Sequence, residues 1–227
     1  EGDVGEGIRG SGVPREEIFL TTKVWWTDLA AAALVRSAEK SLRLLGVDYV
    51  DLLLVHWPNP QVPLAETMDA LGSVLERGLT RHIGVSNFPT PLLAEAVRLS
   101  EAPLVANQVE HHPYLDQRKV HAACRKYGMA MVSYCPLHRG GGALQEPAVT
   151  AAAARHGKTP AQIVLRWHVQ QEDVAVIPRT SRKERLTENA AIFDFSLEAD
   201  EMEAIGGLRS ANQRICDYSF SPEWDAS

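Results

Sequence analysis

Two basic residues stand at the ends of consecutive apolar segments, where each could take part in proton transfer. Lys23 lies near the end of segment 18–24, and His56 follows the apolar run 52–55. A lysine ammonium beside a phenol lowers the pKa of that phenol, and a neutral histidine can donate a hydrogen bond to a carbonyl oxygen that gains negative charge. Taken singly, Lys23 could be an ion-paired lysine and His56 a satisfied core histidine. Their shared position favours the chemical interpretation.

Later segments end in groups that suit a binding site. Ser86, Asn87 and Gln108 offer hydroxyl and amide groups for a carboxamide, and Tyr134 offers a flat ring for stacking. These types at successive segment ends predict recognition of a planar polar ligand.

A group of phosphate donors follows the last apolar segment. Arg179, Thr180 and Arg185 offer hydrogen-bond donors beside the start of a predicted helix. The charges at 182–185 could instead form a solvated helix face. Pro178 argues against this alternative, because it fixes the turn that leads from the segment into the helix.

Six short, mostly apolar segments position these groups, and we predict that all six are strands. Continuous rather than alternating apolar character is typical of strands that are buried on both faces of a parallel sheet. The segments are 18–24, 50–56, 82–86, 104–109, 130–134 and 174–178.

Helix signals lie between these strands. Apolar residues recur every three or four positions through 31–45, and Gly46 follows as a stop. Thr159 precedes Pro160 and Gln162 with the spacing of a capping box, the run 181–184 repeats that spacing, and 90–91 resembles another start. Alternating strands and helices predict an α/β fold with a parallel sheet.

The polar strand ends decide between two α/β folds. A (β/α)8 TIM barrel has eight strands and about 250 residues, and all its strands end at the face that carries the active site. A doubly wound sheet would concentrate polar groups at one switch point. No GxGxxG follows a strand, and the glycines at 140–142 lack that spacing. We therefore predict a barrel of which about six βα units are present.

Composition restricts the class of protein. The chain has 227 residues, of which 45% are hydrophobic, and a net charge of −6, which argues against a nucleic-acid partner. No apolar run is long enough to cross a membrane. Three cysteines without a CxxC pair are typical of reduced thiols in the cytoplasm. His111 and His112 point opposite ways in an extended segment, without a carboxylate or cysteine at ligand spacing, so we expect no metal.

Several motifs, in the family's order, resemble the aldo-keto reductase family over essentially the whole chain. The closing SPEWD at 221–225 is similar to bacterial members of the diketogluconate reductase type. The motifs are LTTKVW at 20–25, LVHWP at 54–58, RHIGVSNF at 81–88, NQVE at 107–110, YCPL at 134–137, and IPRT at 177–180 with Arg185, Glu188 and Asn189.

The resemblance implies a role for each matching residue. Lys23 and His56 would be catalytic, and Trp25 and Trp57 would line the substrate pocket. The residues that it implies for NADP(H) are Ser86, Asn87 and Gln108 at the carboxamide, Tyr134 at the nicotinamide ring, Arg179, Thr180 and Arg185 at the 2′-phosphate, Glu188 and Asn189 at the adenine, and Leu137 as a further cofactor contact.

The function that the resemblance implies is NADPH-dependent reduction of an aldehyde or ketone, such as a sugar, a keto acid or a small dicarbonyl. The alternatives are a non-catalytic NADP-binding regulatory module and an inactive, truncated barrel. We expect one domain over 1–227, a full-length protein that is monomeric and cytoplasmic, and no nucleic-acid or membrane partner.

The sequence also departs from the family pattern. We expect the family's first two strands, first helix, and catalytic aspartate and tyrosine to be missing ahead of the segment 3–9. A chain made without them should aggregate or lose stability, and should reduce no carbonyl. Trp26, His111, Cys135 and Arg179 replace residues that are commoner in relatives. Trp26 and His111 bear on substrate preference, and Arg179 keeps the charge that a phosphate needs.

Overall fold

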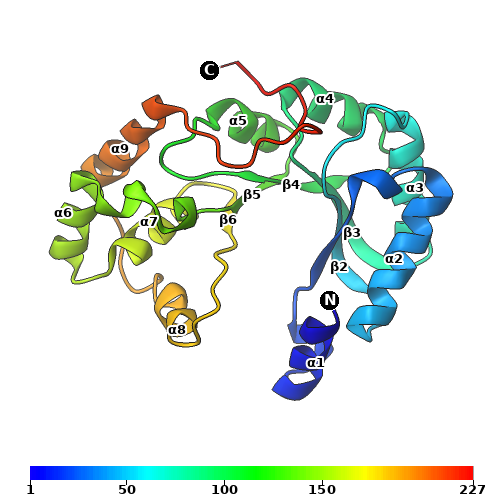
Figure 1. Ribbon diagram of the computed structural model, residues 1–227, viewed down its shortest axis with the longest axis horizontal. Coiled ribbons are helices and arrows are strands. Elements are labelled where there is room, and N and C mark those ends of the chain that lie inside the picture. The colour runs from blue at the N-terminus through cyan, green and yellow to red at the C-terminus, as the bar shows by residue number, and fades with distance from the viewer. Residues whose placement is uncertain (227) are drawn as a thin grey trace. The chain divides into compact units, whose positions relative to one another are not determined.

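The computed structural model describes residues 1–226, in which strands and helices alternate (Figure 1). The strands are β1 (Thr21–Val24), β2 (Val50–Val55), β3 (Thr80–Ser86), β4 (Leu104–Glu110), β5 (Ala130–Tyr134) and β6 (Val174–Val176). The α-helices are α1 (Gly2–Ser11), α2 (Ala31–Leu45), α3 (Leu64–Glu76), α4 (Thr90–Leu99), α5 (Arg118–Lys126), α6 (Pro147–His156), α7 (Pro160–Val169), α8 (Glu184–Ala190) and α9 (Ala199–Gly207). Short 3-10 helices are η1 (Arg15–Glu17), η2 (Trp26–Asp28), η3 (His138–Gly140), η4 (Gly142–Gln145) and η5 (Leu208–Ala211).

The strands pair in the order in which they follow along the chain, from β1 to β6. The pairs β1–β2, β2–β3 and β5–β6 are parallel. This arrangement confirms the predicted α/β fold with six βα units of the (β/α)8 type. Within residues 1–226, no helix is long and apolar enough to cross a membrane.

Strand boundaries differ from the predicted ones at both ends of this order. β1 begins at Thr21 rather than at residue 18, and the N–H of Leu20 just before it donates to the Asp51 carboxylate at 2.9 Å. β6 ends at Val176, although the Ile177 N–H still donates to the Ser133 carbonyl at 3.1 Å. Pro178 has no N–H, so the ladder cannot continue past it. β3 begins two residues earlier than predicted, and β4 ends one residue later.

The described chain divides into two compact units. The first unit contains Glu1–Asn107 and Phe220–Trp224, and the second contains Gln108–Ser219 with the residues from Asp225 onward. A single domain over 1–227 stays a prediction.

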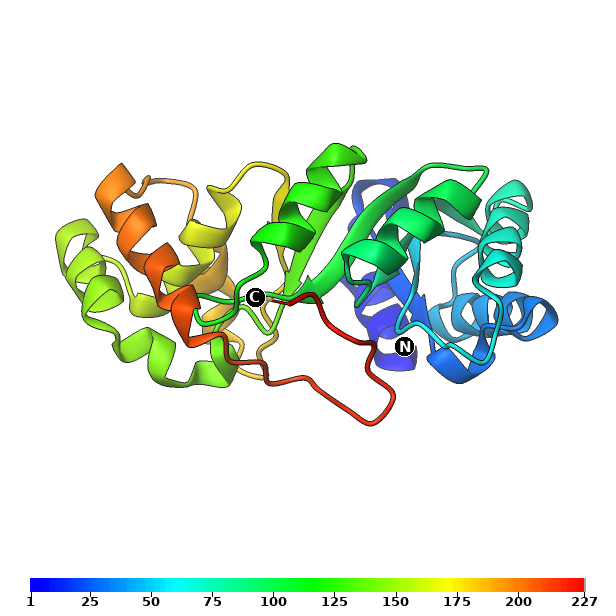
Figure 2. The same ribbon diagram turned by 90° about the horizontal axis from the view of Figure 1, so that it is seen from above.

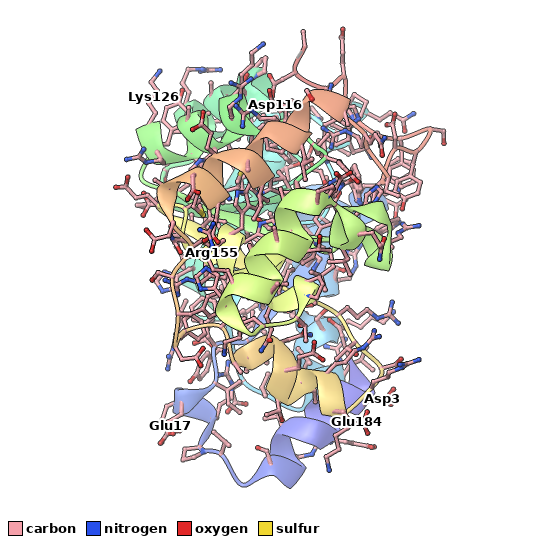
Figure 3. The ribbon with its side chains drawn as sticks, turned by 90° about the vertical axis from the view of Figure 1, so that its left-hand side faces the viewer. Asp3, Glu17, Asp116, Lys126, Arg155 and Glu184 are labelled. Atoms are coloured by element: carbon pink, nitrogen blue, oxygen red, sulfur yellow. The ribbon has the colours of Figure 1, made fainter. Side chains whose placement is uncertain are left out.

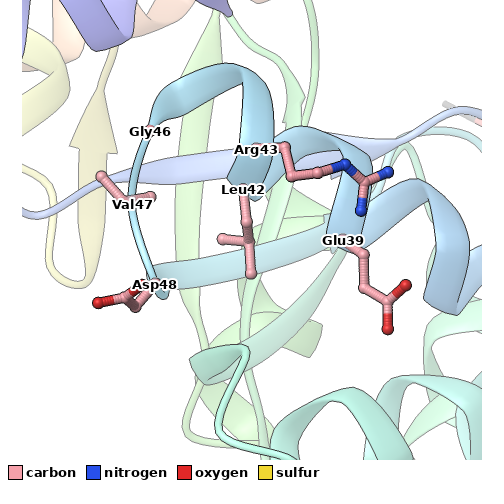
Figure 4. A pocket seen from close by; sticks show the side chains of 6 residues that line it. All are labelled: Glu39, Leu42, Arg43, Gly46, Val47 and Asp48. Atoms are coloured by element: carbon pink, nitrogen blue, oxygen red, sulfur yellow. The ribbon is translucent and has the colours of Figure 1, made fainter.

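Helix α2 of the first unit shows the predicted amphipathic pattern. Its residues Leu34, Ala38, Leu42 and Leu45 are all buried, and α2 packs beside α3 (Figure 1). Gly46 ends the helix in a left-handed conformation with φ of 68°, and its N–H donates to the Leu42 carbonyl at 2.9 Å. A pocket at this end contains none of the predicted site residues (Figure 4). It is lined by Glu39, Leu42, Arg43, Gly46, Val47 and Asp48.

Strand β2 is buried along its whole length, so its carboxylate Asp51 needs partners. Arg15 pairs with Asp51 at 2.8 Å, Arg81 pairs with it at 3.2 Å, and the Leu20 N–H donates to it at 2.9 Å. Burial by itself would raise the pKa of Asp51, but these donors hold that pKa below its usual value. Both guanidinium groups also lie over the Tyr49 ring, which completes this structural cluster.

The second unit has its own apolar core between α6, α7 and α9, which lie side by side in both views (Figure 1 and Figure 2). Val149, Ile163 and Ile205 are fully buried there. Arg155, near the end of α6, pairs with Glu201 of α9 at 3.2 Å (Figure 3). Figure 3 also labels Lys126, which ends α5 in the same unit.

Helix caps were predicted with mixed success. The capping box at α7 is confirmed, because the Gln162 N–H donates to the Thr159 hydroxyl at 3.3 Å and the Thr159 N–H donates to Gln162 Oε1 at 3.0 Å. The box at 181–184 is wrong: α8 begins at Glu184, and no side chain caps it. The Arg182 N–H donates instead to the Thr180 hydroxyl at 3.1 Å, a local turn that competes with helix initiation. The start at 90–91 is confirmed, with Thr90 as the first helical residue.

Removing the confirmed cap should destabilise the protein. We expect Thr159→Ala to lower the free energy of unfolding by about 1 kcal/mol, because an N3 amide loses its acceptor. Urea denaturation followed by circular dichroism measures this change. Ser181→Ala is the matched control and should leave the midpoint unchanged, since Ser181 does not cap α8. Equal losses from both variants would contradict the assignment.

Candidate active site

The parallel register of β1 and β2 brings Lys23 and His56 together in the first unit. Lys23 pairs with Leu54 across the two strands, and His56 lies two residues beyond Leu54. The His56 N–H donates to the Val24 carbonyl at 2.9 Å, which holds the residue beside the end of β1. Both side chains are half-buried. The predicted pair therefore occupies adjacent strand ends.

The electrostatic environment keeps His56 neutral. Burial lowers the pKa of His56, and the positive charge of Lys23 lowers it further, to about 4. Burial also lowers the pKa of Lys23. A neutral imidazole at pH 7 has one N–H to donate, which is what a polarised carbonyl oxygen requires.

The interpretation of Lys23 and His56 as a catalytic pair stays a prediction. Among residues 1–226, no carboxylate forms a salt bridge with Lys23. Within the same residues, the His56 ring contacts Trp25 edge-on, with 4.9 Å between centroids, and its nitrogens have no protein hydrogen-bond partner. A satisfied core histidine would have such a partner.

Asn87 positions His56 from the end of β3. It adopts a left-handed conformation with φ of 63° and is buried. Its Nδ2 donates to the His56 carbonyl at 2.9 Å and to the Ser86 hydroxyl at 3.1 Å. The amide nitrogen of Asn87 therefore has a structural role here, and the cofactor roles of Ser86 and Asn87 stay predictions.

Aromatic side chains surround the predicted catalytic pair. Trp25 is 41% exposed, whereas Trp57 is buried. Phe220 contacts both, with centroids 5.7 Å from Trp25 and 5.5 Å from Trp57. These rings give the predicted substrate side of the site a largely apolar surface beside His56.

Two further aromatic contacts of the C-terminal segment were not predicted from the sequence. Phe220 stacks on Trp26 at 5.2 Å, and Trp224 meets Trp57 at 6.0 Å. The C-terminal segment is far from Trp57 in the sequence and has no periodic pattern, so the sequence could not place it. The motif at 221–225 was its only signal.

The second unit carries the remaining predicted ligand groups. Tyr134 ends β5 half-buried, and burial raises the pKa of its phenol, so it stays protonated at neutral pH. Gln108 is 5% exposed in β4. Leu137 packs against the core of α6 and α7. The roles of these three residues in cofactor binding stay predictions.

The proposed phosphate donors are open to solvent. Arg179 and Arg185 are exposed, and Thr180 is half-buried. Within residues 1–226, no carboxylate forms a salt bridge with either arginine. Their charges are therefore available to an anionic ligand in the second unit.

Glu188, predicted to face adenine, also connects α8 with α7. Its carboxylate accepts a hydrogen bond from the Thr159 hydroxyl at 2.6 Å, and its carbonyl accepts one from Gln162 Nε2 at 3.0 Å. Asn189 beside it is half-buried. An adenine role for these two residues stays a prediction.

Sequence reasoning missed the role of Glu110 in the second unit. Its buried carboxylate bonds to His112 Nε2 at 2.9 Å and accepts from the N–H groups of Ile215 and Cys216 at 2.7 Å each. Sequence reasoning did not pair Glu110 with His112, although the two residues are only two positions apart. The opposite orientation of His111 is confirmed by its bond to Ser133 at 3.0 Å.

The depressed pKa of His56 makes a testable prediction. Because the folded pKa of about 4 lies below the ordinary 6.5, the unfolded chain binds a proton more readily between these values. The His56 contribution to stability is therefore present above pH 6.5 and is lost as pH falls towards 4. NMR titration of the His56 ring measures the folded pKa directly.

Lys23→Met should raise that pKa only partly, since burial is the larger cause. Lys40→Met is the charge-matched control on α2 and should leave the titration of His56 unchanged. A wild-type His56 that titrates near 6.5 would contradict the assigned environment.

Comparisons with known proteins agree with this arrangement. The model of the aldo/keto reductase family matches residues 1–209. Methylglyoxal reductase DkgB of Escherichia coli O157:H7 is 40% identical, over 99% of this chain and 85% of the relative. An aldo-keto reductase of Mycobacterium avium (strain 104) is 41% identical, over 96% of this chain and 76% of the relative.

Solved structures give the same result. A putative 2,5-diketo-D-gluconic acid reductase B is 49% identical, with a TM-score of 0.96 over 99% of this chain and 80% of that one. A Bombyx mori aldo-keto reductase in complex with NADP is 33% identical, with a TM-score of 0.89 over 96% and 77% of the two chains. These matches do not support the expected absence of an N-terminal segment, which stays untested. The chain belongs to the aldo/keto reductase family.

Proposed function

We propose that this protein reduces an aldehyde or ketone to the alcohol with NADPH. The observation that carries the proposal is a neutral His56 held beside an aromatic surface and beside Lys23, which forms no salt bridge within residues 1–226. Family membership supports carbonyl reduction, and the names of two relatives indicate dicarbonyl and keto-sugar substrates. We infer a small carbonyl compound as the substrate class.

The proposed reaction gives distinct tasks to the residues of the first unit. When bound, NADPH supplies a hydride for the carbonyl carbon. His56 donates its N–H to the carbonyl oxygen and stabilises the charge that develops there. The Lys23 ammonium adds positive charge, which would lower the pKa of a phenolic proton donor placed beside it. Trp25 and Trp57 exclude water from the reacting groups.

The second unit supplies groups that fit the cofactor. Arg179, Thr180 and Arg185 offer donors without carboxylate competitors, as a 2′-phosphate requires. Tyr134 offers a protonated, half-buried ring for the nicotinamide. The NADP complex of the Bombyx mori relative supports the same choice of cofactor.

Turnover tests the proposed reaction. Wild-type protein should oxidise NADPH when methylglyoxal is added, and His56→Ala should lower kcat about a hundredfold or more, because a positioned hydrogen-bond donor is lost. Steady-state absorbance of NADPH measures the rate. NADPH affinity should stay unchanged in this variant.

His82→Ala is the control for this test, since His82 is exposed on β3 and should keep full activity. Wild-type protein that binds NADPH tightly but reduces no aldehyde or ketone would contradict the proposal and favour a regulatory NADP-binding module.

Cofactor choice is tested at Arg185. A charged hydrogen bond to phosphate contributes about 1.5–3 kcal/mol, so Arg185→Ala should weaken NADPH binding about tenfold or more. Binding of NADH, which lacks the phosphate, should hardly change. Quenching of tryptophan fluorescence gives both dissociation constants. Arg36→Ala on α2 removes the same charge elsewhere and should change neither, and a wild type that prefers NADH would overturn the proposal.

A further inference from the structure

Two free cysteines lie together in the second unit although they are 81 positions apart. The Sγ atoms of Cys135 and Cys216 are 4.0 Å apart. Cys135 directly follows β5, and Cys216 lies in the segment after η5. The third cysteine, Cys124, is buried in α5.

The backbone around both thiols is fixed. The buried carboxylate of Glu110 accepts the N–H groups of Ile215 and Cys216, which anchors the segment that carries Cys216. Cys135 is held in a left-handed conformation with φ of 51°, and its carbonyl accepts the His138 N–H at 3.0 Å. The short distance between the sulfurs is therefore a consequence of two anchored segments.

The surroundings of the pair distinguish one thiol from the other. The hydrogen bond with Cys216 and the guanidinium of Arg139 lower the pKa of Cys135, although burial opposes them. The pKa of Cys216 is raised by its bond to Cys135, by burial and by the charge of Glu110. Cys135 is half-buried and Cys216 is 5% exposed, so an oxidant reaches Cys135 more readily. The thiolate is the reactive form of cysteine.

We propose that Cys135 and Cys216 form a redox-active pair that a hydroperoxide oxidises to a disulfide. In the first step the Cys135 thiolate attacks one peroxide oxygen: an S–O bond forms, the O–O bond breaks, and hydroxide leaves and takes a proton from solvent. In the second step the Cys216 sulfur attacks the Cys135 sulfenic acid, the S–S bond forms and the S–O bond breaks. The departing oxygen takes the Cys216 proton and leaves as water. Two thiols and hydrogen peroxide thus give one disulfide and two waters.

The bond requires a small local movement. A disulfide has sulfurs about 2 Å apart, so the two sulfurs must approach by about 2 Å through rotation of their side chains. The link would tie the segment that follows η5 covalently to the end of β5. A dithiol should reverse it.

Thiol counting after peroxide treatment tests the proposal. Reduced protein, freed of reductant and treated with hydrogen peroxide, should fall from three titratable thiols per denatured chain to one, and dithiothreitol should restore all three. Peptide mapping by mass spectrometry without reduction should find the peptides of Cys135 and Cys216 linked within one chain. Cys124→Ser is the control and should still form the link.

Single variants assign the two roles. In Cys216→Ser, the sulfenic acid should persist on Cys135 and be trapped by dimedone, whereas Cys135→Ser should trap none. Arg139→Ala should slow the first step. Wild-type protein that keeps three thiols at a peroxide concentration that oxidises free glutathione would overturn the proposal, and so would links between chains, or sulfinic acid on Cys135 without a link. Mapping of the wild type decides the outcome even where a variant does not fold.

Discussion

The parallel hydrogen-bond register of β1, β2 and β3 determines where the polar groups of the first unit lie. Lys23 pairs with Leu54, Leu54 pairs with Gly84, and each strand ends two or fewer residues later. A shift of one residue would turn every side chain of a strand to its opposite face. The close approach of Gly84 to Ala106, where a Cβ would come within 2.6 Å of the carbonyl oxygen, leaves little freedom for β3. Lys23 and His56 are therefore adjacent because the backbones of β1 and β2 pair in this register, and the buried side chains of the strands keep the register in place.

A buried carboxylate plays the corresponding part in the second unit. Glu110 cannot remain ionised in an apolar interior without donors, and its donors are His112 and two backbone N–H groups more than one hundred residues away. The hydrogen bonds overcome the effect of burial, so the pKa of Glu110 lies below its usual value. The charge therefore fixes an otherwise irregular segment. The same anchoring brings Cys216 beside Cys135, so one desolvated charge explains both the path of the chain and the paired thiols.

Local patterns in the sequence predicted the helices and strands, whereas contacts between residues far apart in the chain could not be predicted. Apolar periodicity placed α2 at its observed bounds, because burial of one helix face repeats every three or four residues. The run 181–184 has the residue types of a capping box, yet it does not cap a helix, because the Arg182 N–H donates to the Thr180 hydroxyl in a local turn. Phe220 has no periodic signal, and its contact with Trp57 becomes visible only in the folded chain. The sequence correctly predicted that Lys23 and His56 lie at adjacent strand ends, because the C-terminal ends of parallel strands lie at the same edge of the sheet.

The strand-end groups of the first unit differ in their exposure and in their hydrogen-bond partners. Asn87 and Asn107 are buried, and their amide nitrogens donate to the carbonyls of His56 and Phe88. Lys23 and His56 are half-buried, and neither charge nor ring nitrogen is neutralised by a partner in the described chain. A positive charge held in a partly desolvated place is stabilised by negative charge that develops nearby, and a neutral imidazole beside it can donate without first losing a proton. A carboxylate beside Lys23 would cancel that field and raise the pKa of His56. Among residues 1–226 no carboxylate forms a salt bridge with Lys23, and the charge of Lys23 therefore adds to burial in lowering the pKa of His56.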